Sequence, residues 1–274
     1  MRIVIAGPER PGGHDPEETS MSAPATHVSD HQHPDPARPD VGAALFSTWS
    51  VGTPERQRAT VDAIAATWEG RPWPDRNLLS YSVYAGTDGD TLMHYSQWTS
   101  EEAYFDFVRN HRQERNDEID TAVPGIKRVG INSYQLYRSH VPDPARRAAE
   151  APGAIVTVDI RFDAEASGRR REWVDTVIEA LTATSSPDCG LLGAHFHLLA
   201  DGEAHLSSAE DRVFNYAEWT SEEVYDESFA AVAGAPSPAW EKVLEFPGFL
   251  GTTVRRYHLL RSFTPHDRQA PQQG

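Results

Sequence analysis

An internal repeat constrains the fold of this 274-residue chain more than any other feature of its sequence. Residues 98–104 read Trp-Thr-Ser-Glu-Glu-Ala-Tyr, and residues 219–225 read Trp-Thr-Ser-Glu-Glu-Val-Tyr. Matching residues continue in the same order on both sides of this motif. The offset between them grows from 113 to 121 ahead of the second tryptophan, which places an eight-residue insertion between Ala200 and Arg212. The chain is therefore built from two related units.

Each unit has the pattern strand, helix, strand, strand, helix, strand. In the first unit, apolar residues at 61, 64, 65 and 68 have the spacing of one helix face. The motif Thr-Ser-Glu-Glu at 99–102 is a capping box that starts the second helix. The alternating, β-rich runs and the turn signals between them predict strands at 41–51, 78–85, 91–98 and 128–139.

A four-stranded antiparallel sheet with two helices on one face leaves its other face uncovered, and a second copy can cover it. We therefore predict an α+β fold in which two ferredoxin-like βαββαβ repeats form an intramolecular pseudo-dimer. The expected boundaries are 41–140 for repeat 1, 141–152 for a linker and 153–263 for repeat 2. Tails at 1–40 and 264–274 are expected to be disordered, because the first has seven prolines and no Phe, Trp or Tyr.

Charge and composition exclude several classes of partner. With 25 Lys and Arg against 41 Asp and Glu, the net charge of −16 argues against nucleic acid and against anionic membranes. The single cysteine, Cys189, excludes a disulfide within the chain and a multi-cysteine zinc site. Neither a transmembrane-length apolar run nor a secretory signal is evident, so a cytoplasmic location is expected.

The repeated Trp-Thr-Ser-Glu-Glu-x-Tyr motif, at a strand-to-helix junction of a βαββαβ unit, resembles the antibiotic biosynthesis monooxygenase (ABM) family. That family belongs to the dimeric α/β-barrel superfamily, and the resemblance covers roughly 42–140 and 152–263. The tandem arrangement resembles actinobacterial members. The resemblance implies an α/β barrel formed by the two halves of one chain. It also implies a small aromatic substrate, such as a polyketide phenol, anthrone or quinol, oxidised by O₂ in secondary metabolism without a cofactor.

Candidate catalytic residues follow from the implied position of the strand-end tryptophan, which in the resembling family faces the pocket between sheet and helices. Because side chains alternate along a strand, His94 and Ser96 share the face of Trp98, and Asn215 shares that of Trp219. We predict His94 as a proton acceptor, since an imidazole titrates near neutral pH. A packed histidine bonded to backbone is the alternative, and core packing explains the two tryptophans equally well.

Substrate-binding candidates in the first repeat are Trp49, Tyr84, Ser96, Arg109 and His111. Haem-degrading relatives of the resembling family carry a ligand histidine about ten residues after the tryptophan. The corresponding residues here are Val108 and Phe229, so the pattern departs from that subfamily, which argues against haem degradation but leaves haem binding open. No cofactor is expected, as in the cofactor-independent members that the resemblance implies.

The second repeat carries a different polar set. His195 and His197 share one face of its second strand, and Asp159 and Arg161 share one face of its first strand. We include His195, His197 and Arg161 among the substrate-binding candidates. His-x-His is half of a metal site at most, and no further ligand is evident from spacing, so no metal is predicted. The difference favours an aromatic-substrate pocket in repeat 1 and a scaffold or accessory role for repeat 2.

Three functions remain open at this point. The first is the cofactor-independent oxygenase, which agrees with the lack of a glycine-rich dinucleotide fingerprint. The second is a non-oxidative cyclase or isomerase of similar substrates. The third is a non-catalytic, small-molecule-binding pseudo-dimer. The chain is expected to be a monomeric pseudo-dimer or a homodimer.

Overall fold

The computed structural model describes residues 23–163, 168–200 and 212–266. Repeat 1 comprises β2 Ala43–Ser50, α1 Pro54–Trp68, β3 Leu78–Gly86, β4 Thr91–Trp98, α2 Glu101–Asn110, α3 Arg112–Ala122 and β5 Lys127–His140. Repeat 2 comprises β6 Ala154–Phe162, α5 Arg170–Thr184, β7 Leu191–Leu199, β8 Arg212–Trp219, α6 Glu222–Gly234, α7 Pro238–Leu244 and β9 Phe249–Pro265. Two elements lie outside the repeats, β1 Thr26–Ser29 and α4 Pro144–Ala149. No helix in these described ranges has the length and apolarity needed to cross a membrane.

The repeated motif starts a helix in both repeats, one residue later than predicted. Ser100, not Thr99, is the N-cap of α2, and its hydroxyl accepts a hydrogen bond from the amide of Ala103. Ser221 caps α6 in the same way. The two glutamates after each serine lie in the first helical turn, where negative charge is favourable beside the helix dipole.

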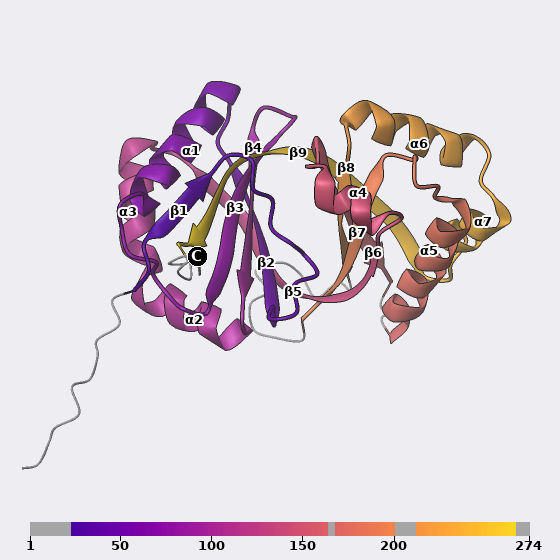
Figure 1. Cartoon of the computed structure of the whole chain (residues 1–274), viewed down its shortest axis with the longest axis horizontal. Helices are drawn as coiled ribbons and strands as arrows, with labels where there is room; N and C mark the ends of the chain where they lie inside the picture. The colour runs from indigo at the N-terminus through magenta and orange to yellow at the C-terminus, as the bar shows by residue number, and fades with distance from the viewer. Residues whose placement is uncertain (1–22, 164–167, 201–211, 267–274) are drawn as a thin grey trace, which may run out of the picture.

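Eight strands, β2 to β9, close into an antiparallel barrel that the two repeats share. The last strand of each repeat is long enough to pair in both repeats. β5 pairs with β2 and then with β7 of repeat 2, while β9 pairs with β6 and then with β3 of repeat 1. Closure leaves none of these eight strands with a free edge. The predicted α+β pseudo-dimer is confirmed, and its helices lie on the outside of the barrel (Figure 1).

Three separate cores follow from this architecture. One lies between the barrel wall and α1 to α3, and a second lies between the wall and α5 and α7. The third fills the barrel interior with the aromatic residues Phe46, Tyr84, Tyr95, Tyr134, Tyr216 and Tyr257. A strand residue therefore points either into the barrel or under the helices, and this choice decides which side chains can meet.

A glycine before the first strand of each repeat packs directly against the backbone of the repeated motif. The amide of Gly42 donates to the carbonyl of Trp98, and the amide of Gly153 donates to that of Trp219. A Cβ atom on either glycine would overlap the carbonyl oxygen of the residue after the tryptophan. In both repeats, therefore, the strand-to-helix junction packs against a residue that has no side chain.

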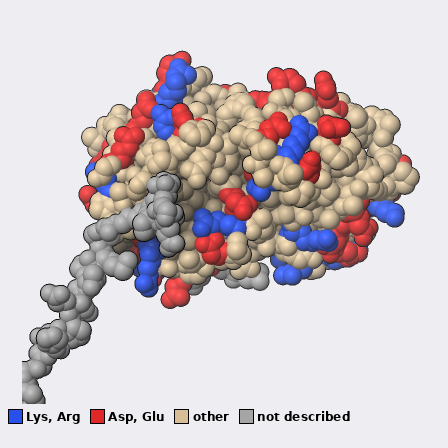
Figure 2. Space-filling model, in the orientation of Figure 1, with Lys and Arg blue, Asp and Glu red and all other residues tan. Residues whose placement is uncertain are grey.

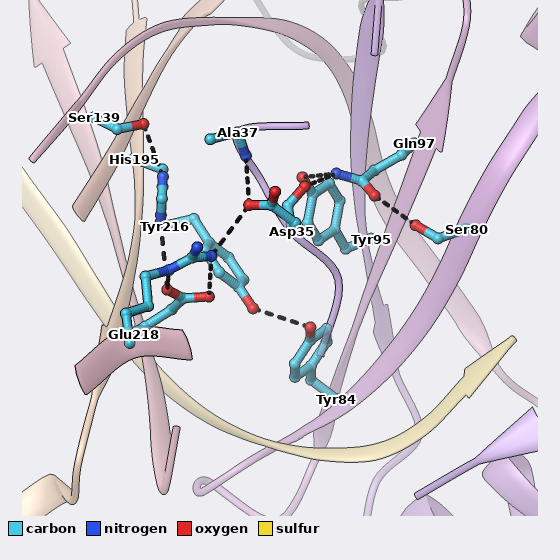
Figure 3. A network of polar contacts seen from close by, with 11 residues as sticks. Asp35, Ala37, Ser80, Tyr84, Tyr95, Gln97, Ser139, His195, Tyr216 and Glu218 are labelled. Atoms are coloured by element: carbon cyan, nitrogen blue, oxygen red, sulfur yellow. Dashed lines mark hydrogen bonds and ion pairs between the residues drawn. The ribbon is translucent and has the colours of Figure 1, made fainter. Parts of the chain in front are cut away.

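The prediction that residues 1–40 stay outside the fold is wrong for the described part of that segment. β1 pairs with β9 between Thr26↔Pro265 and Ser29↔Ser262, and Pro34 is buried. The Asp35 carbonyl accepts a hydrogen bond of 2.8 Å from Gln97 (Figure 3). Strand pairing and docking on the barrel supply the stability that the segment's own composition does not. Residues 1–22 lie outside the described residues.

The other boundaries also differ from the sequence expectation. The linker contains helix α4, and the last strand continues to Pro265, beyond the predicted end at 263. The expected insertion lies between β7 and β8, but its residues 201–211 are outside the described residues, as are 267–274.

Candidate active site

A cavity of about 100 Å³ lies between the barrel wall and the helices of repeat 1. One ordered water needs only ~10–15 Å³ on a comparable scale, so the space is more than a packing void. Its walls are mostly aromatic and aliphatic. The lining residues are Leu45, Ser47, Trp49, Trp68, Leu78, Tyr81, His94, Ser96, Trp98, Tyr104, Phe107, Arg112, Arg115, Asn116, Ile119 and Ile131.

His94 is a buried titratable side chain in this cavity wall. Its Nδ1 lies 2.7 Å from the hydroxyl oxygen of Tyr81, and its ring centroid lies 4.1 Å from that of Trp49. Its Nε2 is buried and has no hydrogen-bond partner among the described residues. A ring nitrogen in that state is available to a ligand.

The environment of His94 changes its titration. Burial, followed by the positive charges of Arg112 and Arg128, lowers the pKa of His94 to about 3. The expectation of titration near neutral pH is therefore wrong, because an imidazolium is not solvated in this apolar wall. His94 is neutral at neutral pH, and a neutral imidazole offers one nitrogen as acceptor and the other as donor.

The other predicted residues on this face, Trp49, Ser96 and Trp98, also line the cavity. The Trp98 indole donates a hydrogen bond of 2.9 Å to the Ser96 hydroxyl, and its ring meets Tyr104 edge-on at 5.6 Å. In repeat 2, Trp219 meets Tyr225 at 5.4 Å and nearly the same angle. Both tryptophans thus pack the helix start, and Trp98 additionally borders the cavity.

Three of the predicted substrate contacts in repeat 1 lie outside the cavity lining. Tyr84 points into the barrel, where its hydroxyl lies 3.0 Å from that of Tyr216 (Figure 3). Arg109 is an exposed residue of α2 that pairs with Asp106. His111 is exposed at the break between α2 and α3. Because the chain changes direction at His111, residues of α3 rather than the end of α2 reach the cavity.

Sequence reasoning missed the residues that do reach it. Arg112, Arg115, Asn116 and Ile119 have the spacing of one helix face and line the cavity from α3. Tyr81 shares the cavity-facing side of β3 because Val83 pairs with His94 across the sheet. The helix spacing was visible in the sequence, but it is a polar stripe, which ordinarily indicates a solvated face.

The predicted contacts in repeat 2 do not form a second pocket. His195 and His197 are fully buried inside the barrel. His195 lies between the hydroxyl of Ser139, at 2.8 Å, and the carboxylate of Glu218, at 3.4 Å (Figure 3). Arg161 is exposed on β6. No three His, Cys, Asp or Glu side chains gather into a metal-binding group within the described ranges.

The strand registers of the two repeats show what repeat 2 lacks. Leu78 and Leu191 both pair with the strand-end tryptophan, so the position of Tyr81 in β3 is Ala194 in β7. His94 corresponds to Asn215 on β8, since Val83 and Phe196 are their respective partners. The hydroxyl and imidazole pair is therefore confined to repeat 1, although Asn215 faces the helices as predicted.

Comparison with known proteins identifies the fold. The chain superposes on the crystal structure of an anthrone oxidase-like protein with a TM-score of 0.65 and 12% identity, covering 85% of this chain and 97% of that one. A candidate monooxygenase from Fusobacterium nucleatum gives a TM-score of 0.50 at 9% identity, covering 81% of this chain and 95% of that one. No protein-family model and no curated protein matches the sequence. The chain thus shares its fold with these two structures, and both halves of its α/β barrel come from one polypeptide.

Two buried neutral histidines lead to a prediction about acid stability. Burial, as the main cause in each case, lowers the pKa of both His94 and His197 from 6.5 to about 3. Below pH 6.5 the unfolded chain binds protons that the folded chain rejects, so stability is complete above 6.5 and falls toward pH 3. Each histidine contributes about 1.4 kcal/mol per pH unit in that window.

We therefore expect His197→Leu to lose about 2 kcal/mol less stability than wild type between pH 7 and pH 5. Urea unfolding at both pH values measures this difference, whatever the absolute stability of the variant. Equal losses in the two proteins would contradict the assignment of a neutral, buried His197.

Proposed function

We propose that the protein oxidises an electron-rich aromatic phenol, anthrone or quinol with O₂, without a cofactor, in the cavity of repeat 1. The observation that carries this proposal is the unpartnered Nε2 of a neutral His94 in an aromatic-walled cavity. The fold similarity to an anthrone oxidase-like protein supports the same chemistry. The aromatic substrate would itself be the reductant, so the protein needs a dry site, a proton acceptor and a hydrogen-bond donor for the oxyanion.

Tyr81 and His94 supply the last two groups. With its proton on Nδ1, His94 donates to the Tyr81 oxygen over 2.7 Å, and the Nε2 lone pair is free to accept a proton from the substrate. The substrate anion formed beside the ring then supplies the opposite charge that an imidazolium otherwise lacks in this wall. The Tyr81 hydroxyl hydrogen is then free to bond the oxygen on which negative charge develops. Burial raises the pKa of Tyr81, so this hydroxyl stays protonated and remains a donor.

The reaction balances for a substrate with a reactive methylene group between aromatic rings. Nε2 removes one methylene proton, and the carbanion transfers its electrons to O₂ as a carbon–oxygen bond forms. The resulting peroxide anion takes the proton back from His94. Loss of water then breaks the oxygen–oxygen bond, removes the second methylene hydrogen and leaves a carbonyl. One O₂ is consumed and one water released, and the substrate supplies all four electrons.

The test is oxygen uptake by metal-free, purified protein offered a small panel of anthrones and naphthoquinols. We expect uptake above the spontaneous rate, with one O₂ consumed per carbonyl formed from an anthrone. Substrate conversion that proceeds equally well without O₂ would favour the cyclase or isomerase instead. Binding without conversion under either condition would leave a small-molecule-binding protein.

A further inference from the structure

The cavity of repeat 1 has two guanidinium groups without an acidic partner. Arg112 and Arg115 both line it, and neither forms an ion pair with any carboxylate of the described residues. Other arginines of this region are paired, as Arg128 is with Asp120 at 3.0 Å. Glu118, three residues beyond Arg115, pairs with Arg71 at 2.9 Å.

Most of the hydrogen-bond donors on these two groups are unused. The Arg112 guanidinium donates to the Tyr104 hydroxyl at 3.2 Å, and that of Arg115 donates to the Thr67 carbonyl. Each guanidinium has five N–H donors, so several remain available to a ligand. Arg115 is additionally held over the ring of Trp68, 4.3 Å from its centroid, which fixes its position.

The positive charge of Arg112 and Arg115 is opposite in sign to the net charge of the protein. The net charge is −16, and on the face in Figure 2 acidic and basic side chains are interspersed. Arg112 and Arg115 are half-buried, and burial followed by the charge of Arg71 lowers the pKa of Arg115. Glu118 and Glu114 act on Arg115 only through space, without a salt-bridge contact. A partly desolvated cation without a contacting counter-ion is costly, and a bound anion would relieve that cost.

The two ends of the cavity differ in polarity. Its deep end is apolar around His94, which is 5% exposed, and Leu45, which is 1% exposed. The half-buried arginines and Asn116 mark its solvent side. The indole rings of the cavity wall border the space as well. A ligand that fills this space would place an aromatic ring inside and an anionic group at the mouth.

We propose that the cavity binds an aromatic carboxylate, with the carboxylate held by Arg112 and Arg115 and the ring directed toward His94. A planar carboxylate matches the guanidinium fork, and the Asn116 amide adds a neutral donor. The group to be deprotonated, a methylene carbon or a phenol oxygen, then lies at the opposite end of the ligand from its acid group. The binding of the carboxylate does not depend on the proposed function; only the statement that the ligand is a substrate rests on it.

The test compares 6-hydroxy-2-naphthoate with its methyl ester by titration calorimetry at pH 7. The two probes share the ring and the phenol, and the ester carries a methyl group in place of the negative charge. We expect the acid to bind wild type at least ~10-fold more tightly, and Arg112→Gln or Arg115→Gln to weaken the acid about 10-fold while leaving the ester unchanged. Arg109→Gln, a nearby surface arginine outside the cavity, is the matched control and should bind both probes as wild type does.

Equal affinity of wild type for acid and ester would overturn the proposal, and this comparison needs no variant to fold. Equal weakening by Arg109→Gln would also overturn it, because the effect would then be general electrostatics. Arg112-dependent binding of the acid without oxygen uptake on any substrate would remove the proposed oxygenase but keep the carboxylate site. Oxygen uptake that is equal on acids and esters would keep the oxygenase and remove the carboxylate site.

Discussion

Replacing His94 by Gln is expected to reduce kcat for oxygen uptake by about 10²–10⁴-fold, the usual contribution of a positioned general base. Gln keeps a polar group of similar size in the wall but cannot accept the substrate proton. Stopped-flow or electrode measurements of O₂ consumption at saturating substrate give kcat directly. Because the loss is in proton transfer, KM should change far less than kcat.

Two further variants make this prediction specific. Tyr81→Phe removes the hydroxyl that contacts His94 Nδ1 and donates to the developing oxyanion, and we expect a loss of about 10²–10³-fold. Asn215→Ala alters the equivalent position of repeat 2, outside the cavity, and should leave turnover unchanged. Full activity in His94→Gln would remove His94 from the mechanism. Loss of activity in Asn215→Ala instead would move the site to repeat 2.

Replacing Arg147 by Ala is expected to have the largest effect on stability, about 3 kcal/mol or ~6–12 °C in Tm. Arg147, on α4, contacts the carboxylate of Glu218 at 2.6 Å and that of Asp35 at 3.2 Å. The Glu218 side chain is 2% exposed, so removing the guanidinium leaves a buried carboxylate without its main counter-charge. The contact also joins the linker to Glu218 of the barrel and to Asp35 of the N-terminal segment, two residues that Figure 3 shows facing each other.

Arg146→Ala is the matched control, because Arg146 lies next to Arg147 on the same short helix. Its partner at i+4, Glu150, has a side chain that is 41% exposed, against 2% for Glu218, and such solvent-accessible pairs contribute only about 0.5 kcal/mol. Thermal unfolding of the two variants side by side gives the comparison. Equal shifts in Tm would show that α4 as a whole, and not the buried ion pair, is responsible.

The pH dependence of this contact has a definite sign. Burial alone would raise the pKa of Glu218, but hydrogen bonds from His195 and Arg147 hold it below its usual value of 4.5. An acid whose pKa is lowered on folding stabilises the protein above its unfolded pKa. That contribution is lost as the pH falls through the folded pKa. Wild type and Arg147→Ala should therefore converge in stability in acid.

The sequence by itself determined the two-repeat organisation. The copies of Trp-Thr-Ser-Glu-Glu-x-Tyr begin helices in both halves, and the alternation in the third strand correctly put His94 and Trp98 on one face. These are local properties, since capping and strand periodicity depend on neighbours within a few residues. For the same reason the βαββαβ order of each repeat could be read without the structure, although β1, α3, α4 and α7 could not.

Only the tertiary structure decided which polar residues meet. Tyr84 and His195 lie in the barrel interior because closure of the sheet gives each strand face a different neighbour. Arg112 and Arg115 reach the cavity because the chain breaks at His111, and Tyr81 reaches His94 through strand register. The N-terminal segment is held by β9 and Arg147, which are distant in sequence. Contacts between such distant residues depend on how the barrel closes, and no local pattern encodes that closure.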